Sequence, residues 1–227
     1  MSTSTPADSS MGPSPLLIFP CNGNAREAVD ALGDAFHLLG FVDDEPVRSW
    51  PSAWGLGPWS VMDRSGLTRH PRAQVLAVPG SEKSYLQRRA VIEALGISDD
   101  RWATVIHPRA SVSPRAKIGR NVLVMAGAVI CGDAVVGDHV VVLPQAVIHH
   151  DCQVGDFTLV CSGTVLAGGV QVGRNCYIGS RTSVRPSLRI GDRALTGMGS
   201  VVLRDVPESI WVAGTPARPL IHRGSKI

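Results

Sequence analysis

The sequence predicts a small α/β domain in its first half, followed by a parallel β-helix in its second half. Two observations support this prediction. Aliphatic residues recur every six positions over the second half, and short apolar runs alternate with helix-like segments over the first. The overall composition, with 44% hydrophobic and 18% charged residues, is typical of a globular chain and not of a disordered one.

The six-residue period continues without insertion to the end of the second half. Sixteen of the seventeen residues at this spacing are aliphatic; the set is Ile106, Val112, Ile118, Val124, Ile130, Val136, Val142, Ile148, Val154, Val160, Leu166, Val172, Ile178, Val184, Ile190, Thr196 and Val202. A period of six matches neither an α-helix nor an alternating strand, and it is the signature of a parallel β-helix with triangular coils. A β-sandwich would instead show turn signals at a varied spacing of about 8–12 residues.

The first half alternates predicted strands with predicted helices. We expect strands at 16–19, 37–44, 73–80 and 103–108, and helices at 25–33 and 81–96. Asn24 and Ser81 are the expected N-caps of the helices, and Gly33 the expected stop of the first. This alternation predicts a small parallel sheet of Rossmann type.

The predicted domain bounds follow from these patterns. They are a disordered tail at 1–15, a Rossmann-like domain at 16–104, a β-helix domain at 105–204 and a C-terminal tail at 205–227. Residues 45–72 are expected to form an irregular insert. Its tryptophans, Trp50, Trp54 and Trp59, are expected to pack against the sheet, although they could also line a ligand site.

The N-terminal segment, the apolar runs and the cysteines indicate where the protein is located and whether its cysteines are oxidised. The start, MSTSTPADSSMGPSP, has no basic or apolar region of a signal peptide, and no apolar run approaches the ~18 residues of a membrane span. The five cysteines are odd in number and show no CxxC spacing, which fits reduced thiols and not a disulfide framework or a zinc site. We therefore expect a soluble, cytoplasmic protein.

The charge distribution bears on the ligand. Basic residues number 13 against 16 acidic ones over residues 1–165, and 9 against 3 over residues 166–227. The net charge of +3 is too small to indicate nucleic acid. A basic excess confined to the C-terminal quarter suits a small phosphate-bearing ligand better than a membrane or a duplex, but a merely solvated face would explain it equally well.

One hexapeptide carries unusual residues at its corner. It reads IHHDCQ, with Ile148 and Cys152 at the inward positions and His149, His150 and Asp151 at the corner. Corners prefer small turn residues, and local misfits of this kind often mark functional sites. The three could equally be polar residues in a solvated turn. If three chains packed around an axis, this corner would lie in a cleft between subunits, where ligand sites form.

The sequence resembles the sugar acetyltransferases of the NeuD/PglD type, within the left-handed β-helix acyltransferase superfamily. The stretches that carry the resemblance are GFVDD, HHDCQVGDF, LAGGVQVG and VAGTPARPL, and it covers roughly residues 16–220. It implies a left-handed β-helix and a homotrimer. The implied activity is acetyl transfer from acetyl-CoA, bound along the C-terminal coils without a metal, to a nucleotide-linked amino sugar.

The resemblance also implies roles at the corner. His150 matches the family's general base and Asp151 the carboxylate that orients its ring, while His149 is a neighbour where relatives often carry glutamate. An imidazole, with an ordinary pKa near about 6.5, can accept the proton of an attacking amine, and a carboxylate on its other nitrogen selects the tautomer. Gly168, one coil later, could donate its N–H to the thioester oxygen, or be only a corner residue.

The acceptor-binding residues that the resemblance implies lie in the first domain. Asp43 and Asp44 match an acidic pair that meets the nucleoside, and Gly23 matches a loop glycine at a helix N-terminus, where phosphate is favoured. Asn24 stands where relatives usually have histidine, and Pro20 where they usually have glycine. These departures leave the identity of the acceptor open.

Other functions are weighed against this one. Within the same enzyme class, the reaction could be O-acetylation of a sugar or sialic acid, or acylation of a non-nucleotide amine. A trimeric zinc hydratase needs three histidines that converge between subunits, typically two of them a few residues apart on one chain, whereas His139 and His149 are ten apart. A non-catalytic scaffold would leave the corner histidines without a reason. No nucleic-acid or membrane partner is expected.

Overall fold

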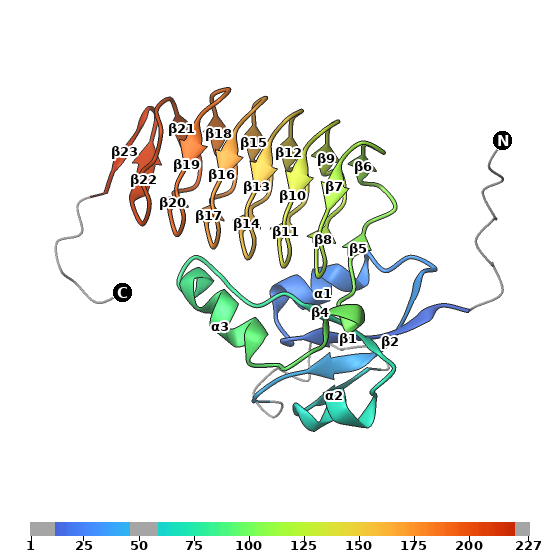
Figure 1. Ribbon diagram of the computed structural model, residues 1–227. Helices are drawn as coiled ribbons and strands as arrows, with labels where there is room; N and C mark the ends of the chain where they lie inside the picture. Colours follow the sequence, from blue (N-terminus) through green and yellow to red (C-terminus); the bar gives the residue numbers. More distant parts are fainter. Residues whose placement is uncertain (1–11, 46–58, 221–227) are drawn as a thin grey trace, which may run out of the picture.

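The computed structural model describes residues 12–45 and 59–220, which form an α/β domain beside a long prism of short strands (Figure 1). The strands of the α/β domain are all parallel, in the order β3-β2-β1-β4; their bounds are β1 (Ser14–Phe19), β2 (Phe36–Val42), β3 (Ser60–Met62) and β4 (Gln74–Ala77). The strand order reverses between β1 and β4. Ligands of open parallel sheets bind beyond the carboxyl ends of the strands at such a point.

The helices of this domain are shorter than the sequence predicts. They are α1 (Gly23–Val29), α2 (Ser65–Arg69), the 3₁₀ turn η2 (Tyr85–Gln87), α3 (Arg88–Glu93) and the 3₁₀ turn η3 (Asp99–Arg101). After α1 the backbone bonds tighten to the i→i−3 type, from Ala31 to Ala28 and from Leu32 to Val29. The predicted helix 81–96 is likewise divided into η2 and α3, because residues 85–87 adopt the tighter turn.

Three local predictions need correction. The N-cap of α1 is Asn22, whose Oδ1 accepts from the N–H of Ala25 at 2.9 Å, so Asn24 lies inside the first turn. Ser81 caps no helix. The predicted irregular insert contains β3, which pairs with β2, and α2. Trp59 is partly buried with its ring edge-on to Phe41, whereas positions 50 and 54 lie outside the described residues.

The second part is a parallel β-helix of two-residue strands. These strands are β5 (Val105–Ile106), β6 (Ser111–Val112), β7 (Lys117–Ile118), β8 (Leu123–Val124), β9 (Val129–Ile130), β10 (Val135–Val136), β11 (Val141–Val142), β12 (Val147–Ile148), β13 (Gln153–Val154), β14 (Leu159–Val160), β15 (Val165–Leu166), β16 (Gln171–Val172), β17 (Tyr177–Ile178), β18 (Ser183–Val184), β19 (Arg189–Ile190), β20 (Leu195–Thr196) and β21 (Val201–Val202). Each pairs with the strand 18 residues further on, which builds three sheets. The hairpin of β22 (Trp211–Gly214) and β23 (Ala217–Pro219) forms the C-terminal end of the eight-stranded sheet. This arrangement fits a left-handed β-helix and confirms the interpretation of the hexapeptide period.

The core of the β-helix is the aliphatic series of the sequence. Every member of the series from Val124 to Val202 is buried. Thr196 is its one polar member, and its hydroxyl accepts from the N–H of Gly179 at 3.2 Å. Ile106 departs from the prediction because it is 40% exposed while its neighbour Val105 is buried. In this first coil Val105 packs into the cluster shared with the α/β domain.

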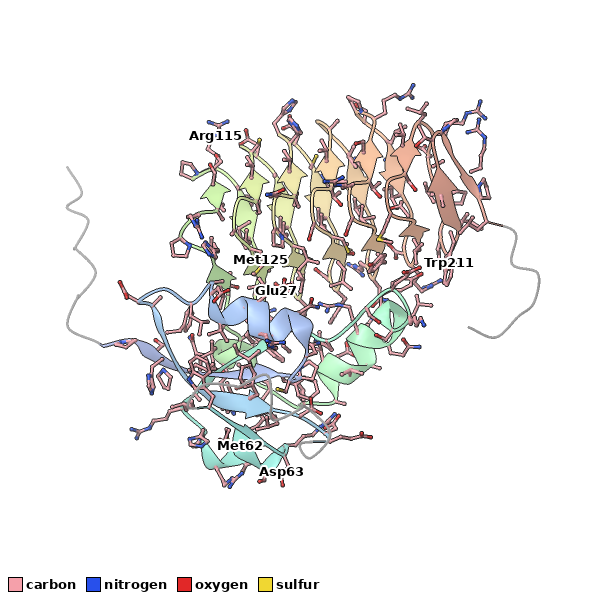
Figure 2. All side chains as sticks on the ribbon, turned by 180° about the vertical axis from the view of Figure 1, so that it is seen from behind. Glu27, Met62, Asp63, Arg115, Met125 and Trp211 are labelled. Atoms are coloured by element: carbon pink, nitrogen blue, oxygen red, sulfur yellow. The ribbon has the colours of Figure 1, made fainter. Side chains whose placement is uncertain are left out.

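One face of the β-helix is covered by the α/β domain of the same chain. The outward residues of the eight-stranded sheet are large and apolar, and they join the core of the α/β domain; they are Leu123, Val141, Leu159, Tyr177, Leu195 and Trp211. Figure 2 labels Met125 above α1 and Trp211 at the other end of this interface. There Trp211 meets Tyr85, with ring centroids 6.4 Å apart. The two parts therefore share one apolar interface.

The five cysteines all lie in the described residues, and none of them is joined to another by a disulfide. Cys131 is partly exposed, and the other four are buried; these are Cys21, Cys152, Cys161 and Cys176. Burial raises the pKa of Cys161 to about 11 and that of Cys176 to about 12. Across residues 12–45 and 59–220, no helix has the length and apolar character that crossing a bilayer requires.

Candidate active site

The corner between β12 and β13 carries the histidine pair. Ile148 and Cys152, both fully buried, anchor the turn on either side. Asp151 adopts a left-handed backbone conformation (φ +59°), which aspartate tolerates better than most residues. The side chains of His150 and Asp151 are each 66% exposed. The turn thus presents both groups to solvent on a rigid base.

His150 and Asp151 form a hydrogen-bonded pair. Nδ1 of His150 lies 2.7 Å from Oδ2 of Asp151. Because an ionised carboxylate only accepts hydrogen bonds, this contact assigns the proton to Nδ1 and leaves Nε2 as an acceptor. The pair therefore presents an unprotonated ring nitrogen to an incoming group. The neighbouring His149 is partly buried, and its backbone N–H donates to Leu166 at 3.0 Å.

Gly168 lies directly against the His150 ring. A Cβ added to Gly168 would be 2.6 Å from Cε1 and 2.7 Å from Nε2 of His150, which is closer than real contacts allow. The neighbouring Gly169 donates its N–H to the carbonyl of His150 at 3.0 Å and ties the two coils together. Within the described part of the chain, the N–H of Gly168 has no acceptor. An imidazole, the carboxylate bonded to it and a backbone N–H without an acceptor among the described residues therefore share one corner.

The predicted acceptor residues gather at the carboxyl edge of the parallel sheet. Gly23 begins α1 and faces open space. The amide of Asn24 makes long contacts of 3.5 Å with the carbonyls of Val78 and Gly80, in the loop that follows β4. The amide of Asn22, which the sequence did not single out, donates to the same Val78 carbonyl at 3.2 Å. The turn after β1 and the loop after β4 therefore form one edge.

Asp43 and Asp44 lie at this edge but already have partners. Asp43 accepts from the N–H of Cys21 and from that of Glu45, both at 2.9 Å, and so joins the end of β2 to the turn after β1. Asp44 binds Arg64 through both carboxylate oxygens, with Nη2–Oδ2 at 2.9 Å. The hydrogen bond to Asp44 raises the pKa of Arg64. Asp43 therefore joins the end of β2 to the turn after β1, and Asp44 is the ion-pair partner of Arg64.

These two groups of residues lie apart in a single chain. His150, Asp151 and Gly168 occupy the corner between the six-stranded and five-stranded sheets. The α/β domain covers the eight-stranded sheet, and Figure 1 draws it on the side away from β12. Within one chain, the structure therefore does not bring Gly23, Asn24 or the acidic pair to His150.

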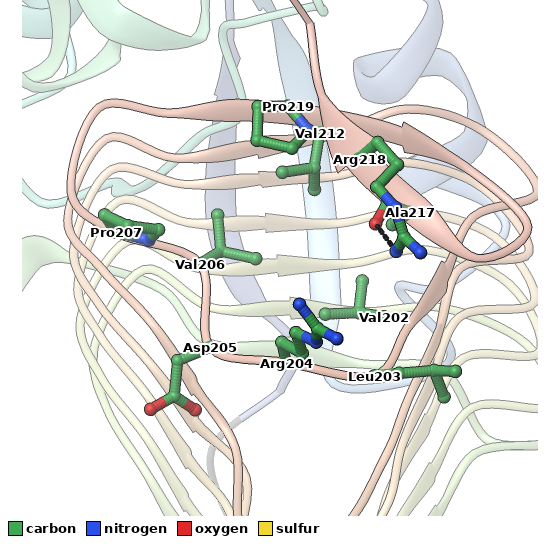
Figure 3. A pocket seen from close by; sticks show the side chains of 10 residues that line it. All are labelled: Val202, Leu203, Arg204, Asp205, Val206, Pro207, Val212, Ala217, Arg218 and Pro219. Atoms are coloured by element: carbon green, nitrogen blue, oxygen red, sulfur yellow. Dashed lines mark hydrogen bonds between the residues drawn. The ribbon is translucent and has the colours of Figure 1, made fainter.

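One arginine, Arg204, lies further along the His150 corner toward the C-terminus. The residues at successive 18-residue steps are His150, Gly168, Pro186 and Arg204. Three strand spacings of about 4.8 Å place the Arg204 backbone roughly 14 Å from that of His150. Figure 3 shows Arg204 and Arg218 reaching toward one another over a hollow floored by Val202 and Val206. In the described ranges, neither arginine has a carboxylate partner.

The described residues contain no group of three His, Cys, Asp or Glu side chains that could hold a metal ion. The groups that this corner presents are the His150 imidazole, the Asp151 carboxylate and the N–H of Gly168. The pair at His150 suits the removal of a proton from an attacking nucleophile, and the N–H of Gly168 suits an oxygen that gains negative charge.

The chain is similar to a known sequence family and to several solved structures. The family described as "Bacterial transferase hexapeptide (six repeats)" matches residues 133–168. The acetyltransferase domain of PglB from Neisseria gonorrhoeae, in complex with acetyl-CoA, is 28% identical, with a TM-score of 0.79; the match covers 92% of this chain and 100% of that one. PerB from Caulobacter crescentus, in complex with CoA and GDP-perosamine, is also 28% identical, with a TM-score of 0.79, over 91% of this chain and 97% of that one.

WeeI from Acinetobacter baumannii shares the fold at 20% identity, with a TM-score of 0.69, over 91% of this chain and 99% of that one. No curated protein sequence matches the chain. The relationship therefore rests on the hexapeptide family and on solved structures that span nearly the whole chain.

Proposed function

Because the chain is a hexapeptide-repeat acyltransferase of the PglD/NeuD type, we propose that it transfers the acetyl group of acetyl-CoA to the amino group of a nucleotide-linked amino sugar. The observation that carries this proposal is the His150–Asp151 pair set against Gly168. Two structures that match over nine-tenths of the chain support it, one with acetyl-CoA and one with CoA and GDP-perosamine.

The proposed reaction is direct acyl transfer. The amine nitrogen of the acceptor attacks the thioester carbon, a C–N bond forms, and the C–S bond breaks to release CoA as its thiol. Nε2 of His150 accepts the proton that the amine loses and returns it to the leaving sulfur. Asp151 holds Nδ1–H and stabilises the imidazolium. The N–H of Gly168 donates to the thioester oxygen as charge develops there.

The C-terminal coils are the proposed place for acetyl-CoA. A long extended ligand with its thioester at His150 would run along the corner toward Arg204 and Arg218. Their guanidinium groups suit the phosphates at the other end of the ligand, since a planar guanidinium binds phosphate through two parallel hydrogen bonds. Arg204 and Arg218 are two of the nine basic residues of the C-terminal quarter.

The parallel sheet is proposed to be a Rossmann-like acceptor domain. Its strand order and the gathering of Asn22, Gly23, Asn24 and Asp43 at the switch between β1 and β4 support this assignment. In this proposal Asp43 shapes the turn that receives the nucleotide. Asp44 contributes through Arg64, whose guanidinium also lies 5.7 Å from the ring centroid of Phe19 at the end of β1.

A homotrimer is proposed because one chain does not complete the site. The turn after β1 and the loop Val78–Gly80 after β4 together form what we call the acceptor edge. The acceptor edge and the His150 corner lie on different sides of the β-helix. An acceptor bound by one subunit must therefore reach the His150 corner of a neighbouring subunit. On the six-stranded sheet beside this corner, the outward residues of β9, β12, β15 and β21 are partly exposed valines suited to burial between subunits, whereas β18 has the exposed Ser183 there. The valines are Val129, Val147, Val165 and Val201. Light scattering should give three times the chain mass of 24.0 kDa, and a monomer would overturn the shared site.

The experiment that tests the function is thiol release from acetyl-CoA. Wild type and His150→Ala are compared across GDP-, UDP- and dTDP-linked amino sugars, with enzyme alone as the blank for protein thiols. Turnover with an amino sugar that is lost in His150→Ala supports the proposal. Turnover only with hydroxyl acceptors would replace N-acetylation by O-acetylation, and no thiol release with any acceptor would overturn acetyl transfer.

A further inference from the structure

The segment that follows β4 is fastened to one corner of the β-helix. This corner, between the five-stranded and eight-stranded sheets, places a residue with left-handed backbone in every coil; the set is Asn121, His139, Phe157, Asn175 and Arg193. The Asn121 amide accepts from the N–H of Ala77 at 2.7 Å and donates to its carbonyl at 3.0 Å. Asn175 donates to the carbonyl of Tyr85, and the Tyr85 hydroxyl donates to that of Arg193, both at 3.0 Å.

Arg88 is the only charged side chain among the buried residues of the described chain. It is 1% exposed. Its Nε donates to the carbonyl of Phe157 at 3.0 Å, its Nη2 to that of His139 at 2.7 Å, and its Nη1 to that of Pro79. No carboxylate in the described residues pairs with it, and burial lowers its pKa. Burying a cation without a counter-ion is costly, so the three carbonyl bonds must provide its stabilisation.

The third of these carbonyls belongs to the acceptor edge. Pro79 lies between Val78 and Gly80, whose carbonyls meet the amides of Asn22 and Asn24. Gly80 has φ +115°, and a Cβ there would be 2.8 Å from both Cγ and Cδ of Arg88. The loop is therefore held on one side by the turn after β1 and on the other by Arg88.

We propose that Arg88 is a positioning residue for the acceptor, which fixes the loop Val78–Gly80 at a set height on the β-helix. This inference rests on the proposed function, in which that loop forms part of the acceptor edge. Arg88 bonds two successive coils through Phe157 and His139, so any shift of the loop along the β-helix would break at least one bond. A planar guanidinium with diverging donors is required, and lysine cannot reproduce this geometry.

Steady-state kinetics of Arg88→Lys and Arg88→Met test the role. We expect the KM for the amino-sugar acceptor to rise at least tenfold, while kcat and the KM for acetyl-CoA stay within twofold. Arg89→Met is the matched control, because Arg89 is the next residue of α3 but is exposed and pairs with Glu93. Gly80→Ala should reproduce the rise in acceptor KM by displacing the Arg88 stem, and it supplies the test if the Arg88 variants do not fold. An unchanged acceptor KM overturns the inference.

Hydrogen exchange of the ligand-free protein separates this inference from the proposed function. The amides of Ala77 and Val78 bond to Asn121 and Phe19 in the native state. They should exchange at least tenfold faster in Arg88→Lys and at the wild-type rate in Arg89→Met. If the wild type acetylates no nucleotide-linked amino sugar, the proposed function fails and the exchange result still decides the positioning. Equal exchange in both variants overturns it.

Discussion

Gly168→Ala tests how closely the His150 ring depends on its neighbour. The new methyl group would lie 2.6–2.7 Å from two ring atoms, against an ordinary separation of about 3.5–4.0 Å. The ring must therefore move by about 1 Å. A misplacement of that size at a reacting group costs roughly 100-fold in rate, so kcat should fall by about two orders of magnitude. Because the ring is mostly exposed and can swing outward, the melting temperature should change little.

The assay is thiol release from acetyl-CoA, at saturating acceptor, for wild type, Gly168→Ala, His150→Ala and the double variant. The clash exists only while the ring is present, so adding Gly168→Ala to His150→Ala should cost no further activity. A second large loss in the double variant would mean that the glycine acts on the substrate independently of the ring. Full kcat in Gly168→Ala would refute the close approach itself.

The other predictions concern the same pair, the acceptor edge and the interface. Asp151→Asn should lower kcat about 10- to 100-fold without changing the acceptor KM, because the amide would donate to Nδ1 of His150 and leave Nε2 protonated; an unchanged kcat would contradict this role. Asp43→Ala should raise the acceptor KM more than it lowers kcat, and an unchanged KM would exclude Asp43 from acceptor binding. Burial lowers the pKa of His139; the charge of Asp138 raises this pKa, and the charge of Arg88 lowers it further. Because the pKa is lower in the folded chain, protonation of His139 favours the unfolded chain, and the free energy of unfolding should decline as the pH falls below about 6.5. Urea midpoints measured from pH 7.5 to 5.5 should show this decline, and His139→Gln should make it smaller.

The acid sensitivity of His139 follows from its surroundings. Its Nδ1 lies 2.9 Å from the Asn121 amide nitrogen, whose oxygen is already held by the N–H of Ala77, so Nδ1 must accept. The ring also stacks on Phe157, with centroids 4.7 Å apart, and meets Trp102 edge-on. A proton on Nδ1 would face a donor in an apolar environment. Unchanged midpoints over this pH range would show that the imidazole has access to water.

Some features of the β-helix are local enough to be predicted from the sequence. Each hexapeptide determines its own inward residue and corner, and the coil repeats this arrangement, so the period placed Ile148 and Cys152 inside and the two histidines at the corner. The prediction fails at the first coil, where Ile106 is exposed, because Val105 packs toward the α/β domain instead. A repeat pattern carries no information about a partner that lies outside it.

Helix ends and ion pairs were less predictable. Asn22 and Asn24 are both suitable caps, and Asn22 caps α1 because its Oδ1 meets the N–H of Ala25. The acidic pair after β2 was expected to face a ligand, but Arg64, 20 residues further on, binds Asp44. That arginine lies beside α2, in the stretch expected to be an irregular insert. Its partner could be found only once β3 and α2 had folded against β2.

The sequence by itself determined the repeat and the corner that carries His150 and Asp151, because each depends on residues close in the chain. Tertiary structure alone decided how closely Gly168 approaches the His150 ring and that Arg88 joins the loop after β4 to two coils. It also decided that the acceptor edge and the corner occupy different sides of one chain. The roles of Arg88 and the separation of the two sites depend on which face of the β-helix the α/β domain covers, and packing between residues distant in sequence determines that face.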